Sequence, residues 1–237
     1  MNLVKERWTK EDVNEFQEYL RIHLNTNKAK VEWSKNLLNT SLPVLVMKTP
    51  DMKEIVNQIA QGNYLSFLDL MIWEYYENTA INGMLISKIK DYDVIKKYLD
   101  IYSEKADNWA TCDLLSFNIK KQESKFFDLV LEYIKSDKPF KRRIGIVVLF
   151  NFVNYDEYID KIFEILNKFE GETEYYVNMI NAWLLCECFI KHRDKTIEFL
   201  NKNKLNKFVV NKAISKCRDS RRVSVADKEM LIKYRRK

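Results

Sequence analysis

Apolar side chains recur at helical spacing along nearly the whole chain, and no stretch alternates apolar and polar positions as a half-buried strand does. Two examples are Val13, Phe16, Leu20 and Leu24 near the start, and Ile159, Ile162, Phe163 and Leu166 further on. Short polar stretches such as KTPD at 48–51 and NKNK at 201–204 separate these apolar segments. The pattern predicts about a dozen helices of roughly 10 to 18 residues each.

Residue types at several breaks match the chemistry of helix ends. Thr49-Pro50-Asp51 places a proline where a helix can begin, and Asp107 or Asn108 can accept a hydrogen bond from a backbone amide just before Trp109. The longest apolar run, 144–153, is about half as long as a membrane span requires. It is therefore predicted to be a buried core helix.

Short loops between helices favour an all-α fold, an α-α superhelix of degenerate repeats, with a compact helical bundle as the alternative. Only four glycines and three prolines occur in 237 residues, which argues against β-sandwiches, glycine-rich phosphate loops and disordered linkers. We expect one domain over residues 1–237 with a basic C-terminal segment at about 202–237.

Positive charge is concentrated in that C-terminal segment. It holds thirteen Lys and Arg residues against Asp219, Asp227 and Glu229, whereas the whole chain carries a formal charge of only +6. Such a segment is typical of a phosphate-binding surface, and a solvated, partly disordered basic tail is the alternative. Lys212, Arg221 and Arg222 are its candidate binding residues.

Trp109 and Asp113 are four residues apart in a helical segment, so their side chains are predicted to project from the same side. That arrangement fits a site, although a solvated Asp and a core Trp are the ordinary alternatives. The same alternative applies to Trp183. We expect Trp8, Trp33 and Trp73 to pack in the core or between repeats, with Trp73 the nearest of the three to a concave face.

Other chemistries find little support in the sequence. Cys186 and Cys188 point about 200° apart on a helix, and the histidines, His23 and His192, lie in separate regions, so no metal site is expected. No serine or cysteine has a suitable His and carboxylate set for a hydrolase triad. The charged start MNLVKERW and the cysteine pattern suggest a reduced, cytoplasmic protein without a signal peptide.

Three segments together resemble a known family. NWATCD (108–113), FKRRIGIVVL (140–149) and YYVNMINAWLLCE (175–187) are similar, in order and spacing, to landmark segments of the AlkD-type DNA alkylation-repair glycosylases built from HEAT-like helical repeats. LPVLVMKTPDMKEIV (42–56) and WEYYENTAINGMLI (73–86) resemble that family's first repeats. The resemblance covers most of the chain.

The resemblance implies functional residues by position. Trp109, Asp113 and Trp183 would be catalytic, and Arg143 would contact DNA. Its neighbours Lys141 and Arg142 are further candidates, because cations near a helix N-terminus oppose the helix dipole and suggest a partner anion. Two positions depart from the family pattern. Cys186 stands where better-studied members have an Arg three residues after the second Trp, and Phe140 stands where they usually have a Trp.

The implied activity is excision of positively charged N3- or N7-alkylated purines from duplex DNA by a monomer that uses no cofactor or metal and binds no membrane. Two other functions stay open. One is a non-catalytic DNA-binding protein on the same fold that recognises damaged or branched DNA, and the other is a helical-repeat scaffold that does not touch DNA.

Overall fold

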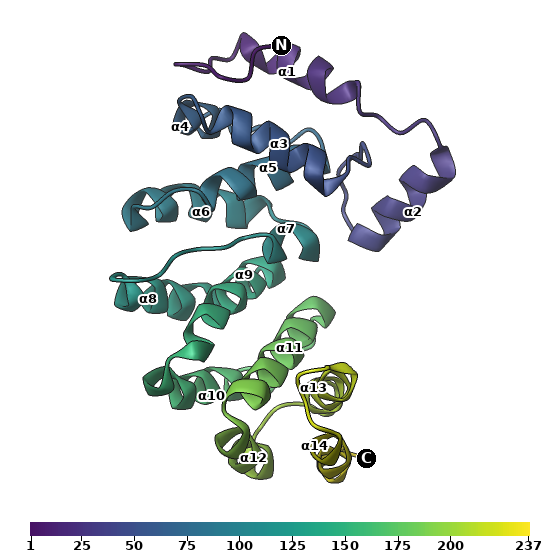
Figure 1. The fold of residues 1–237 in the computed structure, drawn as a ribbon, viewed down its shortest axis with the longest axis vertical. Helices are drawn as coiled ribbons and strands as arrows, with labels where there is room; N and C mark the ends of the chain where they lie inside the picture. Colours follow the sequence, from purple (N-terminus) through teal and green to yellow (C-terminus); the bar gives the residue numbers. More distant parts are fainter. The chain divides into compact units, whose positions relative to one another are not determined.

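The computed structural model describes all 237 residues, and the chain contains α-helices and short 3-10 helices but no strands (Figure 1). The all-α prediction is confirmed, and the successive packed helices are those of an α-solenoid-like fold. None of the helices combines the length and the apolar character that crossing a membrane requires.

The chain divides into two compact units, Met1–Gln122 and Glu123–Lys237. Both units adjoin in sequence, and the expectation of one domain stays a prediction.

The N-terminal unit is built on α5, whose residues are buried along almost its whole length and which packs against α3, α4, α6 and α7. Its helices are α1 (Asp12–Arg21), α2 (Lys28–Leu38), α3 (Thr49–Ile59), α4 (Tyr64–Leu68), α5 (Tyr76–Ile86), α6 (Tyr92–Lys105) and α7 (Trp109–Asp113).

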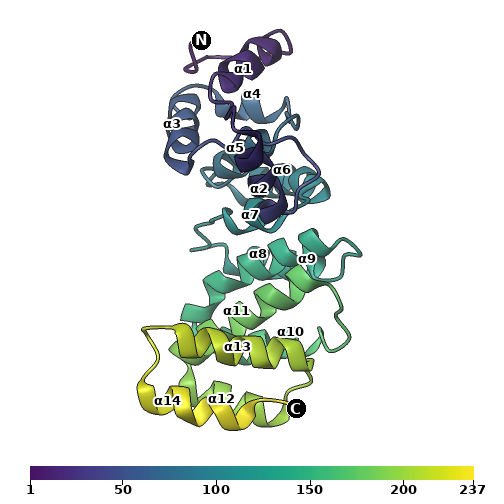
Figure 2. The ribbon, with the colours of Figure 1, turned by 90° about the vertical axis from the view of Figure 1, so that its right-hand side faces the viewer.

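The C-terminal unit is built on α11, which packs against α9, α12 and α13 (Figure 2). Its α-helices are α8 (Glu123–Tyr133), α9 (Pro139–Leu149), α10 (Ile159–Asn167), α11 (Tyr175–Lys191), α12 (Arg193–Lys202), α13 (Lys207–Asp219) and α14 (Val225–Met230). Its 3-10 helices are η1 (Phe150–Asn154), η2 (Asp156–Tyr158) and η3 (Leu231–Tyr234).

The predicted helical stripes form the cores of these units. All four apolar residues of the second example are buried on α10, and Phe16 and Leu20 are buried on α1. Leu24 is 50% exposed, because α1 ends at Arg21. The apolar run 144–153 is largely buried, but it is α-helical only to Leu149 and continues as η1.

The expectations for the three remaining tryptophans have different outcomes. Trp8 is buried with 3% of its surface exposed, and Trp73 is half-buried with its ring 5.9 Å from that of Tyr102. The prediction for Trp33 is wrong, because this residue is 63% exposed on α2. Helix α2 buries only Ser34, so its apolar residues lack the neighbouring layer that would cover them.

A buried carboxylate holds the segment that leads from α2 into α3. Glu77 on α5 is 1% exposed and accepts backbone N–H bonds from Leu45, at 3.0 and 3.1 Å, and from Met47, at 3.2 Å. Val46 between them has a φ of 64°, which is unfavourable for a β-branched residue. Burial raises the pKa of Glu77, and the backbone N–H groups oppose that rise by stabilising the charged form.

Candidate functional site

Trp109 and Asp113 are the first and last residues of α7, a single short helical turn. The side chain of Asn108 caps this turn by accepting a hydrogen bond from the Thr111 amide at 3.0 Å, so the cap is Asn108 rather than Asp107. Trp109 and Asp113 are both half-buried. The four-residue spacing therefore places an indole and a carboxylate on one helical turn, each with surface still accessible.

The orientation of α7 depends on residues about seventy positions earlier in the chain. The indole Nε1 of Trp109 donates to the Leu37 carbonyl at 3.0 Å. One residue before the cap, the Asp107 carboxylate accepts from the Ser41 amide at 2.8 Å and from the Thr40 hydroxyl at 2.8 Å. The indole N–H of Trp109 is thus already hydrogen-bonded within the protein, so a ligand would meet the apolar face of the ring.

Beneath α7, the close approach of α5 and α6 supports the turn. The fully buried Tyr102 hydroxyl donates to the Thr111 carbonyl at 2.9 Å, and burial raises the pKa of Tyr102 well above its usual value. A side chain at Gly83 would place its Cβ 2.6 Å from that hydroxyl and 2.7 Å from Leu114. A glycine is therefore required at position 83 for these elements to pack.

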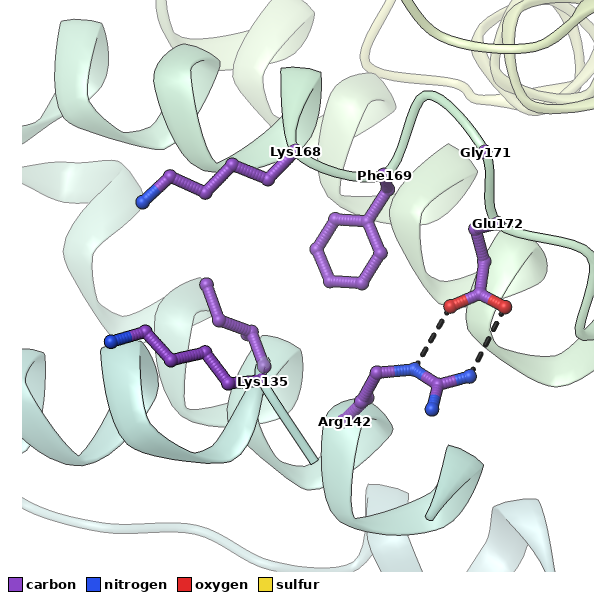
Figure 3. A pocket seen from close by; sticks show the side chains of 7 residues that line it. Lys135, Arg142, Lys168, Phe169, Gly171 and Glu172 are labelled. Atoms are coloured by element: carbon purple, nitrogen blue, oxygen red, sulfur yellow. Dashed lines mark hydrogen bonds and ion pairs between the residues drawn. The ribbon is translucent and has the colours of Figure 1, made fainter. Parts of the chain in front are cut away.

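The basic run at the start of α9, residues 141–143, makes most of its contacts within the protein. Arg142 forms a bidentate ion pair with Glu172, in which Nε lies 2.9 Å from Oε2 and Nη2 lies 3.1 Å from Oε1 (Figure 3). Its Nη1 donates to the carbonyls of Ser136 and Asp137 at 2.9 Å. A cation near a helix N-terminus opposes the helix dipole, and Glu172 supplies the compensating anion for Arg142.

The other two cations of this run differ in exposure. Arg143 is 5% exposed, and its guanidinium donates to the Tyr176 carbonyl at the start of α11. Lys141 is half-buried with its amine 4.9 Å from the centre of the Tyr133 ring. Contacts of Lys141, Arg142 and Arg143 with DNA stay predictions.

Trp183 lies on the exposed side of α11, with 40% of its surface area accessible to solvent. Its ring packs edge-to-face against Phe150 at 5.0 Å, and the amine of Lys216 on α13 lies 5.8 Å from its centre. The ordinary expectation of a core tryptophan does not hold here. A rigid aromatic face with a neighbouring cation can receive a sugar or a phosphate.

Glu187, one turn after Trp183, organises the surroundings of this indole. Its carboxylate accepts from the Trp183 Nε1 at 3.4 Å and forms an ion pair with Arg222, in which Nη1 lies 2.9 Å from Oε2. Sequence reasoning missed Glu187 and Lys216 as members of this cluster. The four-residue spacing of Trp183 and Glu187 could have indicated that their side chains are neighbours on one helix face. Nothing in the sequence indicates that α13 brings Lys216 to the same place.

Cys186 does not reach this surface. It is 3% exposed at the packing of α11 against α13, where a hydrogen bond with the Cys217 thiol lowers the pKa of Cys186. Position 186, where the resemblance implies an Arg, therefore supplies no cation beside Trp183. Two other cations lie near the indole instead. Lys216 lies over the Trp183 ring, and Arg222 is held nearby by its ion pair with Glu187.

The basic C-terminal segment is folded rather than an extended tail. It comprises the end of α12, then α13, α14 and η3. Lys212 is half-buried on α13, and Arg221 is exposed on the turn that follows it. Trp109 and Asp113 belong to one compact unit, and Arg143 and Trp183 to the other.

Comparison with known proteins supplies the family. The model of one family, described as "DNA alkylation repair enzyme", matches residues 15–217, which include α7, the basic run of α9 and the indole surface of α11. No curated protein matches the chain. The family match covers far more than half of the 237 residues and agrees with the resemblance carried by the three landmark segments. The chain belongs to the DNA alkylation repair enzyme family.

Proposed function

We propose that this protein is a DNA glycosylase that excises positively charged N3- or N7-alkylated purines from duplex DNA. The observation that carries the proposal is the pairing of Trp109 with Asp113 on α7, where the indole N–H is tied to Leu37 and both side chains keep accessible surface. Membership of an alkylation-repair family supports the same conclusion at a coarser level.

The chemistry of such lesions fits a single carboxylate. An N3- or N7-alkylpurine already carries a positive charge, so its glycosidic bond is weakened and the base departs as a neutral molecule without a general acid. Sugar hydrolases need a second carboxyl group because their leaving oxygen must be protonated. Asp113 would stabilise the oxocarbenium-like deoxyribose and orient or deprotonate the attacking water.

The indoles would hold the charged nucleotide. An aromatic face attracts a cation by roughly 0.5–2 kcal/mol, depending on how far the contact is desolvated. Each of Trp109 and Trp183 would offer its indole face to the sugar and backbone of the bound DNA, and Arg143 would contact a phosphate. We propose that the protein acts in this way as a cytoplasmic monomer without a cofactor.

The burial of Cys186 favours a second candidate function. Loss of that surface cation reduces the contacts available to hold the lesion, which fits a non-catalytic protein that binds damaged or branched DNA. A scaffold that never touches DNA is the third alternative.

Base release separates these functions. We expect the protein to liberate 7-methylguanine or 3-methyladenine from a methylated duplex and to leave uracil in a matched duplex, because a lone carboxylate gives a neutral base no help in leaving. Released bases are resolved by chromatography, and binding is followed by a gel-shift titration at low salt. Binding without release would select the non-catalytic alternative, and absence of binding would select the scaffold.

A further inference from the structure

The last residues of the chain fold back onto α13. The guanidinium of Arg236 donates from Nη2 to the Asn203 carbonyl at 3.0 Å and to its side-chain oxygen at 2.8 Å, and from Nη1 to the Leu205 carbonyl. Its backbone N–H donates to the side chain of Asn211 at 2.9 Å, and its carbonyl accepts from the same side chain at 2.9 Å. Arg236 is therefore an anchor with a structural role.

The anchor places Arg235 against α13. The Arg235 Nη2 donates to the Ser215 hydroxyl at 2.9 Å, and this hydroxyl in turn donates to the Asn211 carbonyl at 3.0 Å. These residues belong to a cavity of about 490 Å³. Its lining consists of Lys207, Phe208, Asn211, Lys212, Ser215 and Arg235.

The cavity is complementary to an anion. Three of its lining residues are cations and none is acidic. A second basic cavity, beside Lys135 and Lys168, differs because its arginine, Arg142, is already neutralised by Glu172 (Figure 3). The guanidinium of Arg235 has only the neutral Ser215 side chain as its partner and keeps its full charge for a ligand.

Aromatic surface lies next to these cations. Phe208 is 41% exposed, and its ring lies 5.8 Å from that of Tyr175, which is 55% exposed on the neighbouring α11. An apolar ring beside a pair of cations suits a sugar-phosphate chain, since the ring can pack on deoxyribose while the cations meet phosphate oxygens.

The cavity also continues the surface around Trp183. Phe208, Lys212 and Lys216 follow one another at four-residue intervals on α13, so they form one stripe about 12 Å long. Lys216 lies over Trp183. Phosphates of one strand advance by about 3.4 Å along the duplex axis, so this stripe spans roughly three or four of them.

We propose that the cavity on α13, completed by the anchored C-terminal residues, binds the sugar-phosphate backbone of one DNA strand next to the nucleotide held at Trp183. Lys212 and Arg235 contact phosphates, and Phe208 packs against deoxyribose. The inference rests on the proposed function in taking DNA as the polyanion. Arg235 and Arg236 lie beyond residues 15–217, so the family match assigns them nothing.

Binding to an unmodified labelled duplex, measured by fluorescence anisotropy over a series of salt concentrations, tests the proposal. We expect the double substitution Lys212→Ala, Arg235→Ala to lower the slope of log affinity against log salt by about 1.8, because two phosphate contacts are lost. Affinity at moderate salt should fall by roughly 10- to 100-fold.

The matched control removes two cations elsewhere on the same unit. Lys195 and Lys202 on α12 line a groove that also contains Asp160, Glu164 and Glu198, so Lys195→Ala, Lys202→Ala should leave the slope unchanged. Equal losses in both double variants would overturn the proposal, as would an unchanged slope in the first. Arg236→Ala, which removes the guanidinium bonds of the anchor to Asn203 and Leu205, should weaken binding in the same direction.

Two further outcomes separate related ideas. Displacement of the duplex from wild type by inorganic phosphate at low millimolar concentration and constant ionic strength, with no such effect in the Lys212, Arg235 variant, would show a free-phosphate site and overturn the strand assignment. The anisotropy experiment involves no base release. If the wild type releases no base but the Lys212, Arg235 variant still shows the reduced salt slope, the DNA-binding inference is supported and only the glycosylase proposal is contradicted.

Discussion

At the scale of single residues, the partners of a charged group determine what it can do. Arg142 and Arg143 are adjacent in a basic run, and both have partners within the protein: Glu172 forms a bidentate ion pair with Arg142, and the Tyr176 carbonyl accepts a hydrogen bond from Arg143. Sequence alone assigns both to DNA, because nothing in the run reveals an acidic partner thirty residues away. In the structure Arg142 links α9 to the loop before α11, and Arg143 links α9 to the first turn of α11.

Substitution of Arg142 should therefore affect folding more than binding. The side chains of Arg142 and Glu172 are 14% and 8% exposed, so Arg142→Ala leaves a carboxylate buried without its cation. We expect the free energy of unfolding to fall by about 3 kcal/mol, measured by urea denaturation. Lys141→Ala, at the next residue along, should cost under about 1 kcal/mol. Wild-type stability of Arg142→Ala with weakened DNA binding would show instead that Arg142 faces the ligand.

At the scale of elements, α7 depends on a distant segment for its position. One helical turn has few contacts of its own, and the last turn of α2, through Leu37, and the loop after it, through Thr40 and Ser41, supply the missing ones. Asp107 is thereby a positioning residue for Trp109 and Asp113. Sequence reasoning recognised a cap at 107–108 but could not see this second use of Asp107, because its partners lie 66 and 67 residues earlier.

Loss of this support should slow base release while leaving DNA binding largely intact. In Asp107→Ala, α7 loses its links to Thr40 and Ser41, and a shift of about 1 Å in a catalytic group costs on the order of 100-fold in rate. We expect kcat to fall by about 10- to 100-fold, with KM changing by less than about threefold. Asp107→Asn, which keeps one acceptor oxygen, should recover part of the rate.

The control for this variant removes a comparable capping group from another helix. Asp91 caps α6 by accepting from the Val94 amide at 3.0 Å, and Asp91→Ala should cost about 1 kcal/mol of stability without moving α7. Equal rates for the two variants would mean that Asp107 contributes stability only.

At the scale of the whole molecule, the apolar periodicity predicted the all-α class and most helices, because each core stripe is a local property of its own segment. Exposure was less predictable. Trp33 and Trp183 both look like core residues in sequence, yet they are 63% and 40% exposed, since burial depends on which helix arrives from elsewhere in the chain. The resemblance predicts a functional role for Trp183, but the cations beside it, Lys216 and Arg222, are recognisable as its neighbours only in the folded structure.

In the proposed reaction, one carboxylate on α7 promotes the departure of a base whose own positive charge has weakened its glycosidic bond. The most direct measurement is single-turnover release of 7-methylguanine from a methylated duplex by wild type and Asp113→Asn, with the DNA affinity of each protein measured alongside. We expect the wild type to release the base and the variant to release none, although the two proteins bind the duplex with nearly equal affinity. Release by Asp113→Asn at the wild-type rate would contradict it.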